Sequence, residues 1–126
     1  MPIEDLEAGF TVEQVTPPKA GQPVHIVFIE ESHLVDGPVL DALGNRLNAL
    51  HAEHPRLDLL IDLGQVDLMT SSALGLLGMQ HRKLWNAKGR MKLCDIRPSV
   101  MEVLRITRLL GYFDVYRTRA EALASF

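Results

Sequence analysis

The chain has 126 residues, about the length of one domain, with 47% hydrophobic and 23% charged residues, as is usual for globular proteins. The net charge is −3, and acidic and basic residues are mixed along the sequence. This pattern excludes the concentrated basic face that nucleic-acid-binding proteins present to phosphates, so we expect no nucleic-acid partner.

The sequence lacks the usual features of exported and membrane proteins. The single cysteine, Cys94, cannot form an internal disulfide, which is typical of a reducing compartment. The N-terminal segment carries Glu4, Asp5 and Glu7, whereas a signal peptide begins with basic residues followed by an apolar run. No apolar stretch approaches the ~20 residues that cross a membrane. We therefore expect one cytoplasmic domain over residues 1–126, with no membrane partner.

Two extended segments and a helix open the predicted fold. Residues 10–15 alternate as in a half-buried strand, residues 24–29 are rich in β-branched side chains, and the turn between them predicts antiparallel pairing. Asp36 is predicted to cap the following helix, and Pro38 suits its first turn. We expect this helix to end before Pro55. Its apolar stripe consists of Leu40, Leu43, Leu47 and Leu50.

A buried strand and a second helix are predicted next. Residues 57–63 are mostly apolar, as in a central parallel strand that is covered on both faces. After a turn over residues 64–70 a helix begins, and Gly89 is predicted to be the left-handed residue that ends it. The apolar face of this helix is predicted to consist of Leu74, Leu77, Leu84 and Trp85.

The remaining sequence continues to alternate between strands and helices. Residues 90–94 and 112–116 are predicted strands, and Pro98 begins a third helix between them. Thr118 and Glu121 form a capping box for a final helix. The order predicts an α/β fold in which a mixed four- to five-stranded sheet packs with about four helices.

Three consecutive hydroxyl residues follow the predicted central strand, at Thr70, Ser71 and Ser72. Functional sites of open α/β sheets collect beyond the carboxyl ends of the strands. The amides and the dipole at a helix N-terminus also favour a phosphate. Because serine and threonine are equally common as helix caps, the pattern alone leaves both phosphorylation and simple capping open.

The segment around these hydroxyls resembles the signature of STAS domains. Residues 60–75 read LIDLGQVDLMTSSALG, where the family typically reads DLSGVxFIDSSGLG. Further similarities follow in the same order, in residues 88–94, 103–109, 113–116 and 121–123. The resemblance extends over about residues 57–126 and implies a single STAS-like domain.

The antagonist branch of this family implies a binding switch, not an enzyme, and one that needs no cofactor. By resemblance, Ser72 is phosphorylated by the partner, an anti-sigma factor that is a serine kinase. The unphosphorylated form binds this kinase and frees a sigma factor, and the phosphorylated form is released until a serine phosphatase resets it. Thr70 replaces the aspartate of the family, which makes Thr70 and Ser71 rival acceptors. Ala73 and Arg108 replace glycines of the family, and Arg108 stands where a helix normally ends.

Partner contacts are expected beside the hydroxyls and along one face of the second helix. The expected partner-binding residues are Asp67, Met69, Ala73, Gly75, Leu76, Met79 and Lys83. The alternative for Leu76 and Met79 is a place in the core, which is usual for apolar residues on a helix beside a sheet.

Two other classes of function are compatible with the same fold. A scaffold subunit would use the hydroxyls only as caps and would self-associate, for example as a homodimer, through the apolar helix face. An enzyme is disfavoured because neither serine lies in a G-x-S-x-G turn, and because aspartates such as Asp62 and Asp67 commonly cap amides at strand ends. His51 and His54 lack a third ligand at a matching spacing, so no metal site is expected.

Overall fold

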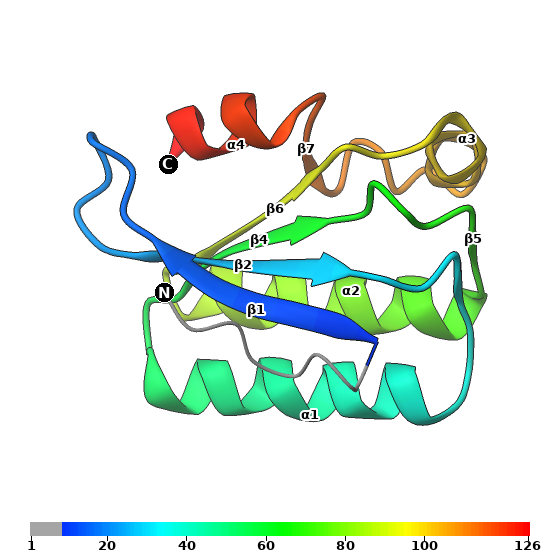
Figure 1. Cartoon of the computed structure of the whole chain (residues 1–126), viewed down its shortest axis with the longest axis horizontal. Coiled ribbons are helices and arrows are strands. Elements are labelled where there is room, and N and C mark those ends of the chain that lie inside the picture. The colour runs from blue at the N-terminus through cyan, green and yellow to red at the C-terminus, as the bar shows by residue number, and fades with distance from the viewer. Residues whose placement is uncertain (1–8) are drawn as a thin grey trace.

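The computed structural model describes residues 9–126, and a sheet of five strands in the order β1-β2-β4-β6-β7 lies at its centre (Figure 1). The strands are β1 (Phe10–Val15), β2 (Val24–Ile29), β4 (Asp58–Asp62), β6 (Arg90–Cys94) and β7 (Asp114–Tyr116). β1 runs antiparallel to β2, as predicted, and the other neighbours are parallel. Every residue of β4 is buried, which confirms the central strand expected in residues 57–63.

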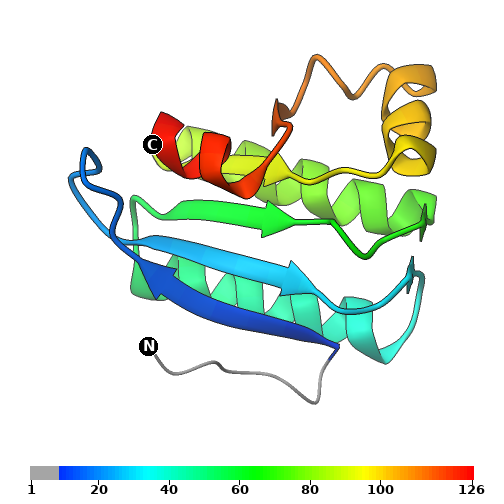
Figure 2. The same ribbon diagram turned by 45° about the horizontal axis from the view of Figure 1, so that its top comes forward.

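Helices cover both faces of this sheet and the carboxyl ends of its parallel strands. α1 (Pro38–Glu53) and α2 (Ser71–Asn86) pack on one face, and α4 (Arg119–Ser125) packs on the other (Figure 1, Figure 2). α3 (Pro98–Ile106) lies beyond the carboxyl ends of the parallel strands. The predicted α/β class, with a mixed sheet and four helices, is confirmed. Over residues 9–126, no helix has both the length and the apolar character that crossing a membrane requires.

The leucine stripe of α1 is buried as predicted, whereas α2 departs from its prediction at one residue. Leu84 is fully buried against the sheet, but the neighbouring Trp85 is 73% exposed. Successive residues of a helix point about 100° apart, so Trp85 faces away from the surface that Leu84 fills. The prediction that Trp85 belongs to the buried face is wrong.

The start of α1 also differs from its prediction. Pro38 lies in the first turn as expected, but Gly37 occupies the cap position with φ 143° and no side-chain hydrogen bond. The predicted capping role of Asp36 is therefore wrong. Its carboxylate instead accepts hydrogen bonds from the start of α2.

The end of α2 needs a glycine, although not for the predicted reason. The left-handed residue is Lys88, with φ 65°, and Gly89 has no positive φ. A Cβ atom on Gly89 would lie 2.4 Å from the Leu57 carbonyl oxygen. Gly89 is thus required because the chain passes very close to the start of β4, and the prediction of a left-handed Gly89 is wrong.

The C-terminal segment follows its prediction except for the length of its strand. β7 contains only the last three residues of the predicted strand 112–116, because Tyr112 lies in the preceding turn and donates a hydrogen bond to a carbonyl of α2. α4 is capped as expected, since the Thr118 hydroxyl accepts a hydrogen bond from the Glu121 amide at 3.1 Å.

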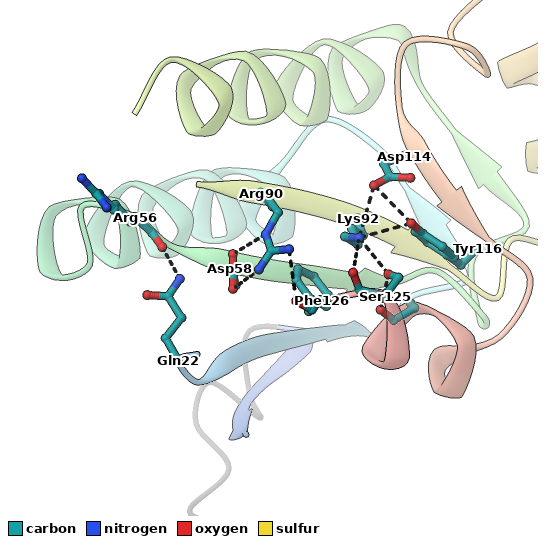
Figure 3. A network of polar contacts seen from close by, with 10 residues as sticks. Gln22, Arg56, Asp58, Arg90, Lys92, Asp114, Tyr116, Ser125 and Phe126 are labelled. Atoms are coloured by element: carbon teal, nitrogen blue, oxygen red, sulfur yellow. Dashed lines mark hydrogen bonds and ion pairs between the residues drawn. The ribbon is translucent and has the colours of Figure 1, made fainter. Parts of the chain in front are cut away.

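A polar network attaches α4 to the sheet (Figure 3). Lys92 is buried, and its Nζ donates to the Ser125 hydroxyl at 2.7 Å and lies 4.7 Å from the centre of the Phe126 ring. Arg90 forms a two-pronged ion pair with Asp58, at 2.8 and 3.1 Å. Both cations are therefore held by hydrogen bonds on the face of the sheet that α4 covers.

α3 ends at a left-handed residue that is not glycine. Arg108 has φ 62°, and the amides of Leu109 and Leu110 both donate to the Leu104 carbonyl. We expect Arg108→Gly to raise the free energy of unfolding by about 1 kcal/mol, because the left-handed region costs an L-residue ~1–2 kcal/mol and the greater entropy of unfolded glycine offsets part of the gain. Urea denaturation would measure this change.

A glycine placed in a regular helix is the matched control for this substitution. Arg82→Gly, in the exposed middle of α2, should lower the free energy of unfolding by about 1 kcal/mol. Equal losses in both variants would show that the positive φ of Arg108 carries no strain.

Candidate functional site

Two strands of two residues each bring the hydroxyl cluster (Thr70, Ser71 and Ser72) against the start of α1. β3 (His33–Leu34) and β5 (Leu68–Met69) pair in parallel, and the amide of Thr70 donates to the carbonyl of Leu34 at 3.2 Å. The residues that follow the two strands therefore lie side by side, near the carboxyl end of the main sheet (Figure 1). The sequence did not reveal these strands, because two residues are too few to show alternation.

The Asp36 carboxylate receives two hydroxyls of the cluster, one on each oxygen. The Thr70 hydroxyl donates to Oδ1 at 3.1 Å, and the Ser72 hydroxyl donates to Oδ2 at 3.2 Å. The Thr70 oxygen also accepts a hydrogen bond from the Ala73 amide at 3.3 Å, so Thr70 is the N-cap of α2. The site thus contains a helix cap and a serine that share one carboxylate.

Ser71 and Ser72 are both exposed, yet their hydroxyls have different surroundings. Ser72 is bound to Asp36, whereas within residues 9–126 the Ser71 hydroxyl has no hydrogen-bond partner. The Ser71 side chain instead borders a hollow beside α2. Of the two exposed serines, only Ser72 therefore has a carboxylate that can orient its hydroxyl hydrogen.

Asp36 supplies a carboxylate beside Thr70, the residue that stands where the STAS signature has an aspartate. The carboxylate missing from position 70 is supplied from the loop before α1, 34 residues earlier in the chain. The sequence could not assign this role, since Asp36 immediately precedes Gly37 and Pro38 and matches a local helix cap. The negative charge beside the hydroxyls is thus retained in a different position.

Asp67, an expected partner contact, is exposed but engaged. Its carboxylate lies 2.9 Å from Arg97 Nη1, and its carbonyl accepts a hydrogen bond from the Ser99 hydroxyl. Both side chains of this ion pair are about half exposed, so the pair contributes at most about 1 kcal/mol to stability. It holds the loop between β4 and β5 against the start of α3.

The other expected partner contacts do not share one surface. Met69 and Ala73 are buried and belong to the core, whereas Gly75 and Met79 are exposed. Two further residues lie toward α1: Leu76 would be 3.4 Å from a Cβ atom built on Gly44, and Lys83 donates to the side-chain oxygen of Asn48. The exposed face of α2 beyond the hydroxyls therefore centres on Gly75 and Met79.

One group of three potential metal ligands exists within residues 9–126: Asp62, Cys94 and Asp95. Asp62 is already bound by Arg119, at 2.8 and 3.0 Å, and by a backbone amide. Burial raises the pKa of the Cys94 thiol far above its usual range, which favours the protonated thiol in the metal-free protein. The group therefore does not have the character of a metal centre.

The aspartates considered as a catalytic pair each have a separate cationic partner. Asp62 binds Arg119, and Asp67 binds Arg97. Each carboxylate is thus engaged by its own guanidinium and not by the other carboxylate. This arrangement does not support paired carboxylate chemistry.

Comparison with known proteins identifies the family that this fold and site define. The model of the STAS domain matches residues 19–122, and the chain therefore belongs to the STAS domain family. The putative anti-sigma factor antagonist BtrV of Bordetella bronchiseptica is 28% identical over 103 residues, which cover 73% of this chain and 89% of that protein.

Solved structures of similar fold include two described as anti-sigma factor antagonists or cell-fate determinants. A STAS domain protein from Planctomyces limnophilus superposes with a TM-score of 0.73 at 24% identity, covering 90% of this chain and 96% of the other. The phosphorylated form of Bacillus SpoIIAA superposes with a TM-score of 0.67 at 18% identity, covering 92% and 97%. At these identities the likeness establishes the fold alone.

Proposed function

We propose that this protein is an anti-sigma-factor antagonist that acts in the cytoplasm and is switched by phosphorylation of Ser72. The observation that carries the proposal is the exposed Ser72 hydroxyl at the N-terminus of α2, hydrogen-bonded to the Asp36 carboxylate at 3.2 Å. Membership of the STAS family and the similarity to BtrV, a putative anti-sigma factor antagonist, support the same function. The partner is an anti-sigma factor with serine kinase activity, and a serine phosphatase restores the unmodified form.

Ser72 is a better phosphoacceptor than either rival hydroxyl. Thr70 also donates to the Asp36 carboxylate, at 3.1 Å, but its oxygen is already engaged with the Ala73 amide as the N-cap of α2. Thr70 is also only partly exposed, whereas Ser72 is exposed. Ser71 is exposed but has no carboxylate beside it. A carboxylate that accepts the proton of the attacking hydroxyl is a recurring part of phosphoryl transfer, and Asp36 is placed to do this for Ser72.

The modified serine would change the charge of the site without a change of fold. A phosphate adds about −1.5 to −2 charges at a neutral hydroxyl. Because Ser72 lies at the helix N-terminus, the α2 dipole favours this charge, while the Asp36 carboxylate opposes it. The phosphorylated surface would therefore repel an acidic group of the partner that the unmodified surface accepts.

Mapping of phosphorylation sites on the protein isolated from its native host tests the proposal. Site-resolved mass spectrometry of the peptide over residues 68–74 should place a phosphate on Ser72. Phosphate on Thr70 or Ser71 would keep the switch and change its residue. A peptide that stays unmodified both in growth and under stress would contradict the switch and favour the self-associating scaffold.

Asp36→Asn should lower the rate of Ser72 phosphorylation by the purified anti-sigma kinase about 10- to 100-fold, because an amide is a far weaker acceptor of the hydroxyl proton. As Asp36 positions and activates the serine, we expect the loss in kcat and little change in KM. Asp41→Asn is the control, because it removes an exposed carboxylate in the first turn of α1, and this variant should be phosphorylated on Ser72 at the normal rate. Equal rates for all three proteins would remove Asp36 from the mechanism.

A further inference from the structure

We propose that the outer face of α2 is a second docking surface, which binds an acidic amphipathic helix of a protein partner. Three hollows of about 520, 500 and 570 Å³ follow one another along this helix. The first and second share Arg82 and Tyr112 in their walls, and the second and third share Trp85 and Asn86. Because neighbouring hollows share lining residues, the three are called here together the α2 groove, from Ser71 to Arg90.

Large side chains stand exposed along the α2 groove. Trp85 is 73% exposed, Met79 is 51% exposed and Tyr112 is 43% exposed. Tyr112 is fixed in place, because its hydroxyl donates to the Gly78 carbonyl at 3.1 Å and its ring meets the His81 ring edge-on. Tryptophan, tyrosine and arginine are the residues most often responsible for binding energy at protein interfaces. The groove thus offers one fixed aromatic side chain, Tyr112, together with the exposed Trp85 and Met79.

The groove has the length of a short partner helix, and glycines line its first hollow. Its first hollow is lined by Gly75 and Gly78, one turn apart, and a Cβ atom on Gly75 would meet nothing within 4 Å. The absence of side chains at these positions allows another backbone to approach closely. From Ser71 to Asn86 the helix extends about 22 Å, which matches a partner helix of about four turns.

The charges around the groove select an acidic occupant. Arg82, Lys88 and Arg90 are in its walls, and none of its lining residues is an aspartate or glutamate. Arg90 is paired with Asp58, but over residues 9–126 neither Arg82 nor Lys88 makes an ion pair. Burial lowers the pKa of His81, so this histidine adds no charge near neutral pH. Carboxylates beside an apolar stripe would complement these two cations.

The same charges disfavour the other possible occupants. A symmetric dimer through the α2 groove would bring Arg82 and Lys88 of two copies onto one surface, where like charges repel. A membrane is flat, whereas the exposed aromatic side chains here line hollows between α2 and the segment around Tyr112. The proposed docking surface rests on Arg82, Lys88 and the exposed aromatic side chains and not on Ser72, so its test is separate from that of the proposed switch.

Trp85 is the only tryptophan of the chain and therefore reports directly on the groove. Two tryptophan-free peptides of about 16 residues, a length that gives four helical turns, would be titrated into the protein. Both carry leucine at i, i+3, i+4 and i+7, and their polar positions are glutamate in one peptide and lysine in the other. We expect the glutamate peptide to shift the Trp85 emission to the blue in a saturable way, and the lysine peptide to cause no shift.

Charge reversal distinguishes the groove from non-specific attraction. Arg82→Glu should weaken binding of the glutamate peptide at least 10-fold, whereas Lys19→Glu, the same charge change in the exposed turn between β1 and β2, should alter it less than two-fold. Equal shifts with both peptides, or no shift, would overturn the proposal. So would a blue shift on concentrating the protein alone, which indicates a second copy, or a shift produced only by vesicles of phosphatidylglycerol, which indicates a membrane.

Discussion

Ser72→Asp is expected to bind the anti-sigma kinase about 5- to 150-fold more weakly than Ser72→Ala, which corresponds to ~1–3 kcal/mol. The added carboxylate stands where the Ser72 hydroxyl now donates to Asp36 at 3.2 Å, so two negative charges meet in the binding surface. The alanine variant keeps the site neutral and should remain in the partner-bound form. Isothermal titration with the purified kinase, at low and at high salt, measures the difference.

Ser71→Asp provides the matched control for this prediction. It introduces the same charge one residue away, on a side chain that forms no hydrogen bond with Asp36 within the described part of the chain. Its effect on affinity should be smaller than that of Ser72→Asp, and both effects should shrink as salt screens the charges. Identical affinities for Ser72→Ala and Ser72→Asp would rule out a charge switch at this position.

Gly89→Ala is expected to lower the free energy of unfolding by about 3 kcal/mol, near the upper end of what overpacking usually costs. The new Cβ atom would lie 2.4 Å from the Leu57 carbonyl oxygen and 2.8 Å from a methyl group of Leu84. Neither neighbour can retreat easily, because the Leu57 carbonyl accepts the amide of Arg90 at 2.9 Å and Leu84 is fully buried. Urea denaturation followed by circular dichroism measures the loss.

The same substitution at Gly75 should have the opposite sign. Gly75 lies inside α2, where nothing lies within 4 Å of a Cβ atom, so alanine should raise the free energy of unfolding by roughly 0.5–1 kcal/mol. The pair of variants separates close packing from helix propensity. If Gly89→Ala proves as stable as Gly75→Ala, the close approach between α2 and β4 cannot be as tight as described.

The regular elements could be predicted because each is encoded by a local pattern. The α1 leucines repeat at helical spacing and are buried, and the apolar run that forms β4 is buried on both faces, as such runs usually are. The prediction for Trp85 fails because Trp85 is adjacent to Leu84 in the sequence, and the spacing of apolar residues does not define the width of the buried helix face. Gly89 was interpreted through the commonest use of glycine at a helix end, whereas its real constraint comes from β4.

The candidate site could be predicted only in part, for a related reason. The hydroxyl cluster is contiguous in the sequence, and its position after the central strand marks it as a site. Asp36 is 36 residues from Ser72, and the two are joined through β3 and β5, which are too short to leave a pattern. No local rule distinguishes an aspartate that caps its own helix from one that reaches the next helix.

The parallel pairing of β3 with β5 makes the proposed phosphorylation site a conformational epitope and not a linear motif. A peptide that contains only the residues around Ser72 lacks the carboxylate that binds the Ser72 hydroxyl, because Asp36 belongs to a distant segment of the chain. In the sequence, α1 and β4 lie between the two segments, so bringing the segments together closes a long loop. In an unfolded chain nothing compensates the entropy lost on closing this loop, and the two segments stay apart. Immature or damaged copies would therefore be poor substrates, and the signal would be restricted to molecules that have completed folding.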